Sequence, residues 1–238
     1  MTNSRINHDS DLLIARQWDC NAQSRFEELN TGQDKTYKNV LCPELHNLLE
    51  KLSPGRSVID VGCGLGFFSD YIHMRGFEVT GVDMSSKCIS IARDKFPSLK
   101  FHNENIIDFS QEKHGQFAAC VANMLFHNVP NVEEVAAAIF GLLKPKGVLV
   151  GCIPHPEYWF DRRRNKAKRV SMSGGYAYLT PFQIKGSDVH PAPFTYFQRK
   201  CDNYLRIFIQ VGFSEVRAVS FENKAGIPDD LVFFIAKK

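Results

Sequence analysis

The feature that most constrains this chain is a glycine-rich turn at residues 58–66, which read VIDVGCGLG. The apolar residues before the glycines are typical of a buried strand, and FFSDYI after them is typical of a helix. Glycine allows positive φ and lets a ligand approach the main chain closely. The turn therefore predicts a strand–loop–helix unit, which can serve a ligand or be only a tight connection.

Apolar runs and helical segments alternate on both sides of this turn. Strands separated by helices form parallel βαβ units with right-handed crossovers. The predicted fold class is therefore α/β, with parallel strands. The expected strands are 57–62, 77–83, 99–106, 116–126, 147–154, 214–221 and 231–238, and the expected helices are 11–29, 43–52, 67–76, 85–96, 132–143 and 204–213.

Two acids at predicted strand ends narrow the choice of ligand. Asp60 precedes the glycines, where it could bind an ammonium group, and Asp83 ends the next strand, where nucleoside-binding folds hold ribose hydroxyls. A dinucleotide loop reads GxGxxG, whereas this loop reads GxGxG and has Phe67 at the third position. No lysine in the loop matches a P-loop. An NAD-dependent oxidoreductase is thus disfavoured, and a ligand with an amino-acid end and a ribose fits better.

The block VIDVGCGLGFFSDYI resembles the first motif of class I S-adenosylmethionine-dependent methyltransferases, near the ubiquinone-pathway and natural-product enzymes. VTGVDMS, NENIIDF, ANMLFHNV and LLKPKGVLVGCIP continue the resemblance through residues 56–154. It implies a Rossmann-like sheet of seven mostly parallel strands with helices on both faces and an antiparallel last strand. It also implies S-adenosyl-L-methionine as cofactor and S-adenosyl-L-homocysteine as product. Asn105 departs from the pattern, because many members have an acid near that position.

The resemblance also implies a cofactor-binding role for nine residues. Asp60 would face the amino group of the methionine part, and Asp83 would hold the ribose hydroxyls. The glycine turn would pass under the ligand, and the remaining residues would meet the adenine or the methionine end. Core packing is the alternative for Met84 and Ile106. The nine residues are Asp60, Gly62, Cys63, Gly64, Asp83, Met84, Asn105, Ile106 and Asn123.

The 238 residues are expected to form a single methyltransferase domain with four parts. Residues 154–198 are rich in proline, glycine and aromatic side chains, and we expect them to be an irregular lid over the substrate. The four parts are an N-terminal helical cap (1–55), a cofactor-binding core (56–153), the substrate lid insertion (154–198), and a C-terminal helix with the last two strands (199–238).

Three histidines are candidates on the acceptor side. His127 follows the strand expected at 116–126, and in this fold that loop lies over the methyl group. As a general base it would make the rate fall at acid pH with a midpoint typical of histidine; the alternative is that it only fixes the loop. His155, in the stiff loop IPHPEYWF, is the second candidate. His190 is expected to be a solvated loop residue.

Nine aromatic residues of the lid could form a wall for a flat or apolar acceptor. The alternative is that they anchor a long loop to the core, and we expect only a few to face the acceptor. They are Tyr158, Trp159, Phe160, Tyr176, Tyr178, Phe182, Phe194, Tyr196 and Phe197.

The basic run RRRNKAKR at residues 162–169 could attract an acidic acceptor or RNA. A solvated basic face is the more common explanation, and the net charge of +3 gives no further sign of nucleic-acid binding. The asparagine-proline-proline-tyrosine motif of DNA adenine and release-factor enzymes is absent, since residues 122–125 read ANML. Nucleic acid is therefore the minority interpretation.

The remaining observations set the cellular context. The seven cysteines are scattered without zinc spacing, so neither disulfides nor a metal site is predicted. No apolar run has the length of a membrane span, no signal core is visible, and a cytoplasmic location is expected. The favoured function is methyl transfer to O, N or C of a small aromatic metabolite. An RNA or protein methyltransferase and a non-catalytic S-adenosylmethionine-binding protein are the alternatives, and the oligomeric state is open.

Overall fold

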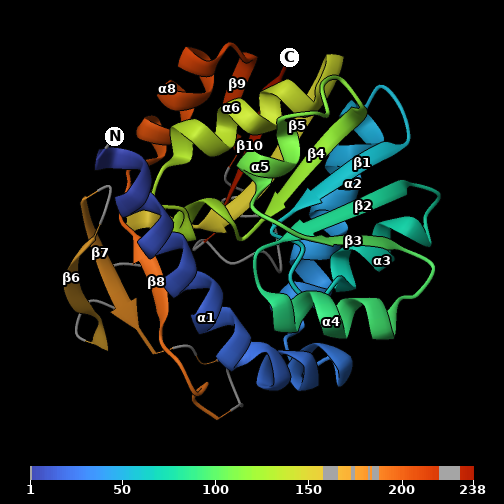
Figure 1. The fold of residues 1–238 in the computed structure, drawn as a ribbon. Coiled ribbons are helices and arrows are strands. Elements are labelled where there is room, and N and C mark those ends of the chain that lie inside the picture. Colours follow the sequence, from blue (N-terminus) through green and yellow to red (C-terminus); the bar gives the residue numbers. More distant parts are fainter. Residues whose placement is uncertain (1, 158–165, 173–174, 182, 184–187, 220–230) are drawn as a thin grey trace.

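The computed structural model describes residues 2–157, 166–172, 175–181, 183, 188–219 and 231–238. Seven strands form its central sheet: β1 (Ser57–Val61), β2 (Glu78–Asp83), β3 (Lys100–Asn103), β4 (Phe117–Asn123), β5 (Leu143–Pro154), β9 (Ser214–Val219) and β10 (Leu231–Lys237). Their order is β3-β2-β1-β4-β5-β10-β9 (Figure 1). The pairs from β3 to β5 are parallel, and β10 is antiparallel to both of its neighbours. The predicted fold class is confirmed.

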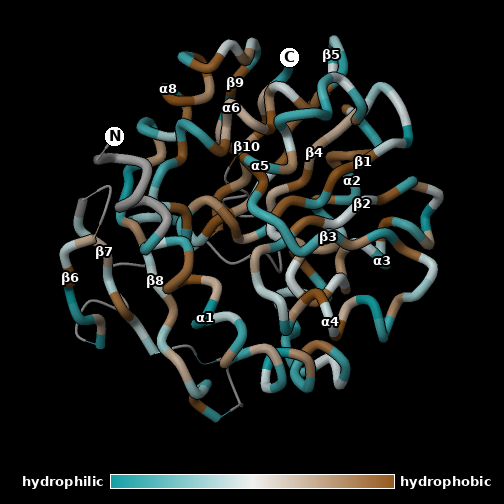
Figure 2. Tube along the Cα trace, viewed as in Figure 1, coloured by the Kyte–Doolittle hydropathy of each residue, from teal (hydrophilic) through white to brown (hydrophobic). Residues whose placement is uncertain are grey.

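Helices cover both faces of this sheet, as predicted. One face packs against α2 (Cys42–Leu52) and α3 (Phe67–His73), and the other packs against α5 (Ile106–Ser110), α6 (Val132–Leu142) and α8 (Cys201–Val211). Successive strand residues point to opposite faces, so a strand covered on both sides is apolar almost throughout. Figure 2 shows these apolar stretches running through the strands at the centre of the molecule.

Short polar side chains fix where the helices beside the sheet begin. The first residue of α4 (Ser86–Lys95) follows Ser85, whose hydroxyl accepts a hydrogen bond from the Cys88 amide at 3.1 Å. Asn105 begins α5 in the same way, through the Ile107 amide at 2.9 Å. The sequence did not predict α5, because its five residues are too few to show a helical period.

A second, smaller sheet corrects the expectation that residues 154–198 are irregular. Strands β6 (Lys168–Met172), β7 (Gly175–Thr180) and β8 (Phe194–Phe197) pair antiparallel in that order. Ala177 and Phe197 of this sheet pack with Ile14 in one apolar cluster. Three of the five β6 residues are solvent-exposed, so their sequence lacks the apolar run that identifies the strands of the central sheet.

The long helix α1 (Thr2–Asn30) connects the two sheets. It contacts α4 beside the central sheet and β8 of the small sheet, and it crosses the front of the molecule in Figure 1. A π-helix, η1 (Tyr37–Leu41), and a short 3-10 helix after β4, η2 (Phe126–Asn128), complete the elements. Among the described residues, no helix is both long and apolar enough to span a bilayer.

Candidate functional site

A cavity of about 900 Å³ lies at the carboxyl ends of the parallel strands, bordered by the glycine turn, α1, η1, η2 and β8. In doubly wound folds this edge of the sheet is where ligands bind. The volume lies at the upper end of the range for small-molecule sites. The cavity therefore has room for a nucleoside-sized ligand and a second small molecule.

The glycine turn forms the floor of the cavity. Gly62 and Gly64 have φ of 71° and 51°, in the left-handed region that favours glycine. A Cβ atom on Gly64 would meet no atom within 4 Å, so this backbone faces open space. A Cβ on Gly62 would lie 2.7 Å from the Leu125 side chain. The turn thus presents bare main chain to the cavity.

Asp83 holds the turn in place from the end of β2. Its carboxylate accepts hydrogen bonds from the Gly64 amide at 2.9 Å and the Ser85 amide at 2.8 Å. Burial raises the pKa of this carboxyl above its usual value, and the two amides oppose that rise. Each oxygen retains a further acceptor site directed away from its amide. Asp83 is therefore both a brace for the glycine turn and a potential ligand group.

Asp60 is a buried carboxyl with one unpartnered oxygen. It is 1% exposed, and its Oδ2 accepts a hydrogen bond from the Ser69 hydroxyl at 2.6 Å. Its Oδ1 is buried without a hydrogen-bond partner. Burial raises the pKa of Asp60 to about 7, and the neighbouring Asp83 adds to the rise. An unpaired acid is costly in such a site, so a cationic ligand group beside it would be favourable.

The far end of the cavity combines α5 and α1. Met84, Asn105 and Ile106 all border it. The Asn105 amide donates to a carboxylate oxygen of Asp11 at 3.2 Å, which ties α5 to the N-terminal helix. Asp11 and Trp18 of α1 also border the cavity, which agrees with the N-terminal helical cap expected from the sequence.

All nine residues that the resemblance implied for cofactor binding border this one cavity. They come from three separate strand ends and the start of α5, so the fold brings them together over 64 residues of sequence, from Asp60 to Asn123. The Oδ1 atom of Asn123 is buried and has no hydrogen-bond partner. Contact of these residues with a bound ligand stays a prediction.

His127 borders the cavity from η2 and is 5% exposed. The centroid of its ring lies 6.2 Å from that of Phe194, which it meets edge-on, and 5.6 Å from that of Tyr196. Burial lowers its pKa to about 3, and Nδ1 is buried without a hydrogen-bond partner. Burial thus favours the neutral imidazole at physiological pH and opposes an ordinary histidine midpoint, and the catalytic role of His127 stays a prediction.

The other acceptor-side candidates lie elsewhere. His155 does not border the cavity, and its Nδ1 accepts a hydrogen bond from the Glu157 amide at 3.4 Å. Among the aromatic residues expected to form a wall, Phe194 borders the cavity, whereas Tyr196 and Phe197 are buried in packing and Tyr176 is 60% exposed. Residues 158–160, 162–165 and 182 lie outside the described part of the chain. Of the basic run, Lys166, Lys168 and Arg169 are described, and all three are exposed.

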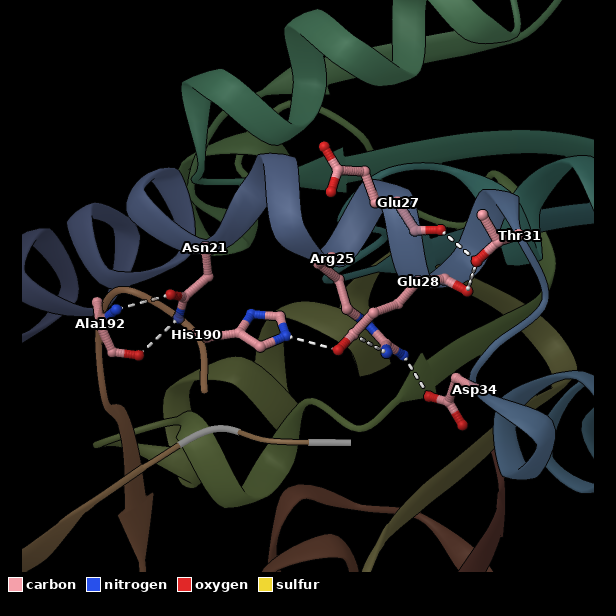
Figure 3. A network of polar contacts seen from close by, with 8 residues as sticks. All are labelled: Asn21, Arg25, Glu27, Glu28, Thr31, Asp34, His190 and Ala192. Atoms are coloured by element: carbon pink, nitrogen blue, oxygen red, sulfur yellow. Dashed lines mark hydrogen bonds and ion pairs between the residues drawn. The ribbon is translucent and has the colours of Figure 1, made fainter. Parts of the chain in front are cut away.

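A buried polar network joins α1 to the insertion (Figure 3). Glu28 contacts His190 Nε2 at 2.9 Å and accepts from Arg25 at 2.9 Å, and Arg25 also donates to Asp34 at 2.8 Å. Asn21 exchanges two hydrogen bonds with the backbone of Ala192. His190 is 5% exposed, which corrects the expectation of a solvated loop residue. The network holds the wall of the cavity that the insertion supplies.

No group of three or more side chains within the described ranges is arranged to hold a metal ion. The seven cysteines are all free thiols, and five of them are buried. Several lie in the apolar layers beside the sheet, where a thiol packs as a small apolar side chain.

Comparison with known proteins identifies the family. A family model described as a methyltransferase domain matches residues 34–186. A ubiquinone biosynthesis O-methyltransferase from Bordetella avium is 30% identical over 139 residues, which are 57% of this chain and 54% of that protein. The chain thus spans about half the length of the curated relatives it matches.

Solved structures share the fold at low sequence identity. An S-adenosylmethionine-dependent methyltransferase from Methanosarcina mazei has a TM-score of 0.60 at 20% identity, covering 82% of this chain and 97% of its own. The 1,6-didemethyltoxoflavin-N1-methyltransferase of Burkholderia thailandensis, solved with S-adenosylhomocysteine, has a TM-score of 0.57 at 16% identity, covering 91% and 86%.

The residues of the cavity fit S-adenosylmethionine. The bare backbone at Gly64 leaves space for the ligand, and the unpartnered oxygen of Asp60 suits its ammonium group. Asp83 stands at the strand end where a ribose is held in folds of this type. Because the family match covers well over half of the sequence, the chain belongs to the methyltransferase-domain family, within the class I S-adenosylmethionine-dependent methyltransferases.

Proposed function

We propose that the protein transfers a methyl group to an oxygen, nitrogen or carbon atom of a small aromatic metabolite. The observation that carries this proposal is the single cavity that joins the glycine turn to a wall built from η1, η2 and β8. A macromolecular acceptor needs an open approach to the methyl group, whereas α1 and the insertion both border this cavity and are joined by the contact between Glu28 and His190. The domain division expected from the sequence is part of the proposal, with residues 154–198 as the substrate-covering part.

The proposal assigns the cofactor end residue by residue. Asp60 binds the ammonium group, Asp83 binds the ribose hydroxyls, and the backbone at Gly62, Cys63 and Gly64 lies under the ligand. Met84, Asn105 and Ile106 contact the adenine, and Asn123 lies at the methionine end. S-adenosylmethionine, when bound, supplies an electrophilic methyl group on a sulfonium. The protein's part is then to align the acceptor and to exclude water, which together can supply about 7–11 kcal/mol.

His127 is the proposed acceptor contact. Its ring borders the cavity, and the neutral imidazole is able to form a hydrogen bond with the acceptor. We propose no direct role for His155, because it lies outside the cavity lining. A cytoplasmic location is supported by the seven free thiols, which are typical of a reducing compartment.

A methyl-transfer screen tests the proposed function. The protein is incubated with S-adenosylmethionine labelled in the methyl group, with small-molecule extracts in one arm and bulk RNA in the other. Label in small molecules supports the proposal. Label in RNA would replace it with RNA methylation, and binding of S-adenosylhomocysteine without transfer to either would favour a non-catalytic binding protein.

A further inference from the structure

The acceptor end of the cavity has mainly apolar walls. Leu41, Leu231 and Met124 belong to one apolar cluster, and Phe194 lies edge-on to His127. All five residues border the cavity. Since this is the proposed acceptor site, the inference below rests on the proposed function and specifies the class of acceptor.

The basic residues of the cavity lining are poorly placed to hold an acidic acceptor. Arg25 and Lys35 are the two basic side chains among the described lining residues. Arg25 is already engaged by the carboxylates of Glu28 at 2.9 Å and Asp34 at 2.8 Å, and Lys35 is exposed to solvent. An acceptor with a carboxylate or phosphate would have to draw Arg25 away from a buried ion pair, which is unfavourable.

The same end offers no side chain suited to take a proton from a hydroxyl before transfer. Both carboxylate oxygens of Asp34 already accept hydrogen bonds, from Arg25 and from the Tyr37 amide at 2.9 Å. Burial raises the pKa of Tyr37 and keeps the imidazole of His127 neutral as a very weak base. Asp60, the remaining buried acid, lies at the proposed ammonium site. A phenol or alcohol would therefore meet no strong base in Asp34, Tyr37 or His127.

The charge of the cavity favours a cation throughout the reaction. Acidic side chains outnumber basic ones on its lining, and two of them, Asp34 and Asp60, are buried, where their field is weakly screened. The acidic lining residues are Asp11, Asp34, Asp60, Asp83, Glu104 and Glu134.

We propose that the acceptor is an uncharged amine or nitrogen heterocycle that is methylated at nitrogen. The nitrogen lone pair forms the new carbon–nitrogen bond while the carbon–sulfur bond breaks with its electron pair going to sulfur. The positive charge passes from sulfur to nitrogen within an acidic cavity, and any proton on that nitrogen is lost to solvent after release. His127 accepts a hydrogen bond from the amine and orients its lone pair, so no base is required in the site.

Binding of matched probes tests the charge of the acceptor without turnover. 5-Aminoindane, 5-indanol and indane-5-carboxylate share one ring system and differ in the polar group, and the aromatic amine is uncharged at neutral pH. With the protein saturated in S-adenosylhomocysteine, ligand-observed NMR titrations should show the amine binding at least tenfold more tightly than the carboxylate. Equal or tighter binding of the carboxylate would overturn the inference. If none of the three probes binds, the products of turnover decide.

The chemistry of the products tests the atom that is methylated. Extract metabolites labelled with a deuterated methyl group are separated by cation exchange and identified by mass spectrometry. The inference expects the label on nitrogen. Label in methyl ethers, the product class that the name of the Bordetella relative indicates, or in methyl esters or C-methyl products would overturn it while leaving the proposed function intact. No labelled small molecule at all, from a protein that binds S-adenosylhomocysteine, would overturn both.

Discussion

The cofactor end and the acceptor end of the cavity are built by different kinds of interaction. At the cofactor end, backbone turns and the ends of neighbouring strands supply the groups that face the ligand. Asp83, for example, accepts a hydrogen bond from the Gly64 amide, 19 residues away in the sequence. At the acceptor end, side chains of α1 meet the insertion over much longer separations, 162 residues for Glu28 with His190 and 178 for Gln17 with Thr195. A local motif therefore specifies the first end, whereas tertiary packing specifies the second.

Removing Glu28 should have the largest effect, because it would break the link between α1 and the insertion. Glu28→Ala leaves Arg25 and His190 without this partner. Loss of one member of a buried ion pair lowers the free energy of unfolding by about 3–5 kcal/mol. For a chain of this size that corresponds to a fall in Tm of roughly 6–20 °C. Differential scanning calorimetry measures it.

The neighbouring Glu27 provides the control for this substitution. It is exposed, and its carboxylate accepts only from the Gln23 side chain, at 3.0 Å. Glu27→Ala should change the stability by no more than about 0.5 kcal/mol. Equal losses in the two variants would show that the Glu28 network does not hold the acceptor end.

The next largest effect is expected at the cofactor end. Asp83→Ala removes two proposed charge-assisted hydrogen bonds to ribose, each worth about 1.5–3 kcal/mol, and the brace on the Gly64 amide. The affinity for S-adenosylhomocysteine should fall by ~100-fold or more in a calorimetric titration. Glu78→Ala, at the exposed start of the same strand, should leave the affinity unchanged. An unaltered affinity in Asp83→Ala would remove this residue from the ligand contacts.

Asp60 should make cofactor binding depend on pH, and this effect should be smaller than that of Asp83→Ala. In the ligand-free protein burial raises its pKa from 3.8 to about 7, so the carboxyl is protonated below that pH and must ionise to hold an ammonium group. Affinity for S-adenosylhomocysteine should therefore fall up to about tenfold per pH unit below pH 7, and Asp60→Asn should lose this dependence.

The stability of the ligand-free protein provides an independent measurement at Asp60. Because its folded pKa lies above the unfolded value, the protonated carboxyl favours folding at low pH, and this contribution is lost as the pH rises from about 4 to about 7. The wild type should lose stability over that window relative to Asp60→Asn. Parallel stability curves for the two proteins would contradict the raised pKa.

What the sequence could predict follows the same division between the two ends. The strands of the central sheet are buried on both faces and therefore appear as apolar runs, and glycines at positive φ mark the ligand turn. Most residues of strand β6 are exposed to solvent, so nothing in its sequence distinguished it from a loop. His190 was expected to be solvated because its partner, Glu28, lies on a helix far away in the sequence. Its contact could not be inferred without the fold.

The smallest effect is expected at His127, and it separates a hydrogen-bonding role from general base catalysis. A general base would lose ~10²–10⁴-fold in turnover on substitution. A neutral imidazole that only orients the acceptor should lose less than about tenfold in His127→Asn, because asparagine retains a hydrogen-bond acceptor. Between pH 5 and 8 the wild type should show no rate change that the variant lacks, since burial holds the pKa near 3.

The pH dependence of the stability gives a readout of His127 that is independent of turnover. Below pH 6.5 the unfolded chain takes up a proton at His127 that the folded protein refuses, so the wild type should lose up to about 1.4 kcal/mol per pH unit relative to His127→Asn as the pH falls. A large loss of turnover together with a histidine-like acid limb would restore the general base and remove the argument for an amine acceptor. A small loss with the steeper wild-type stability curve would instead place His127 on the acceptor as a neutral hydrogen-bonding group.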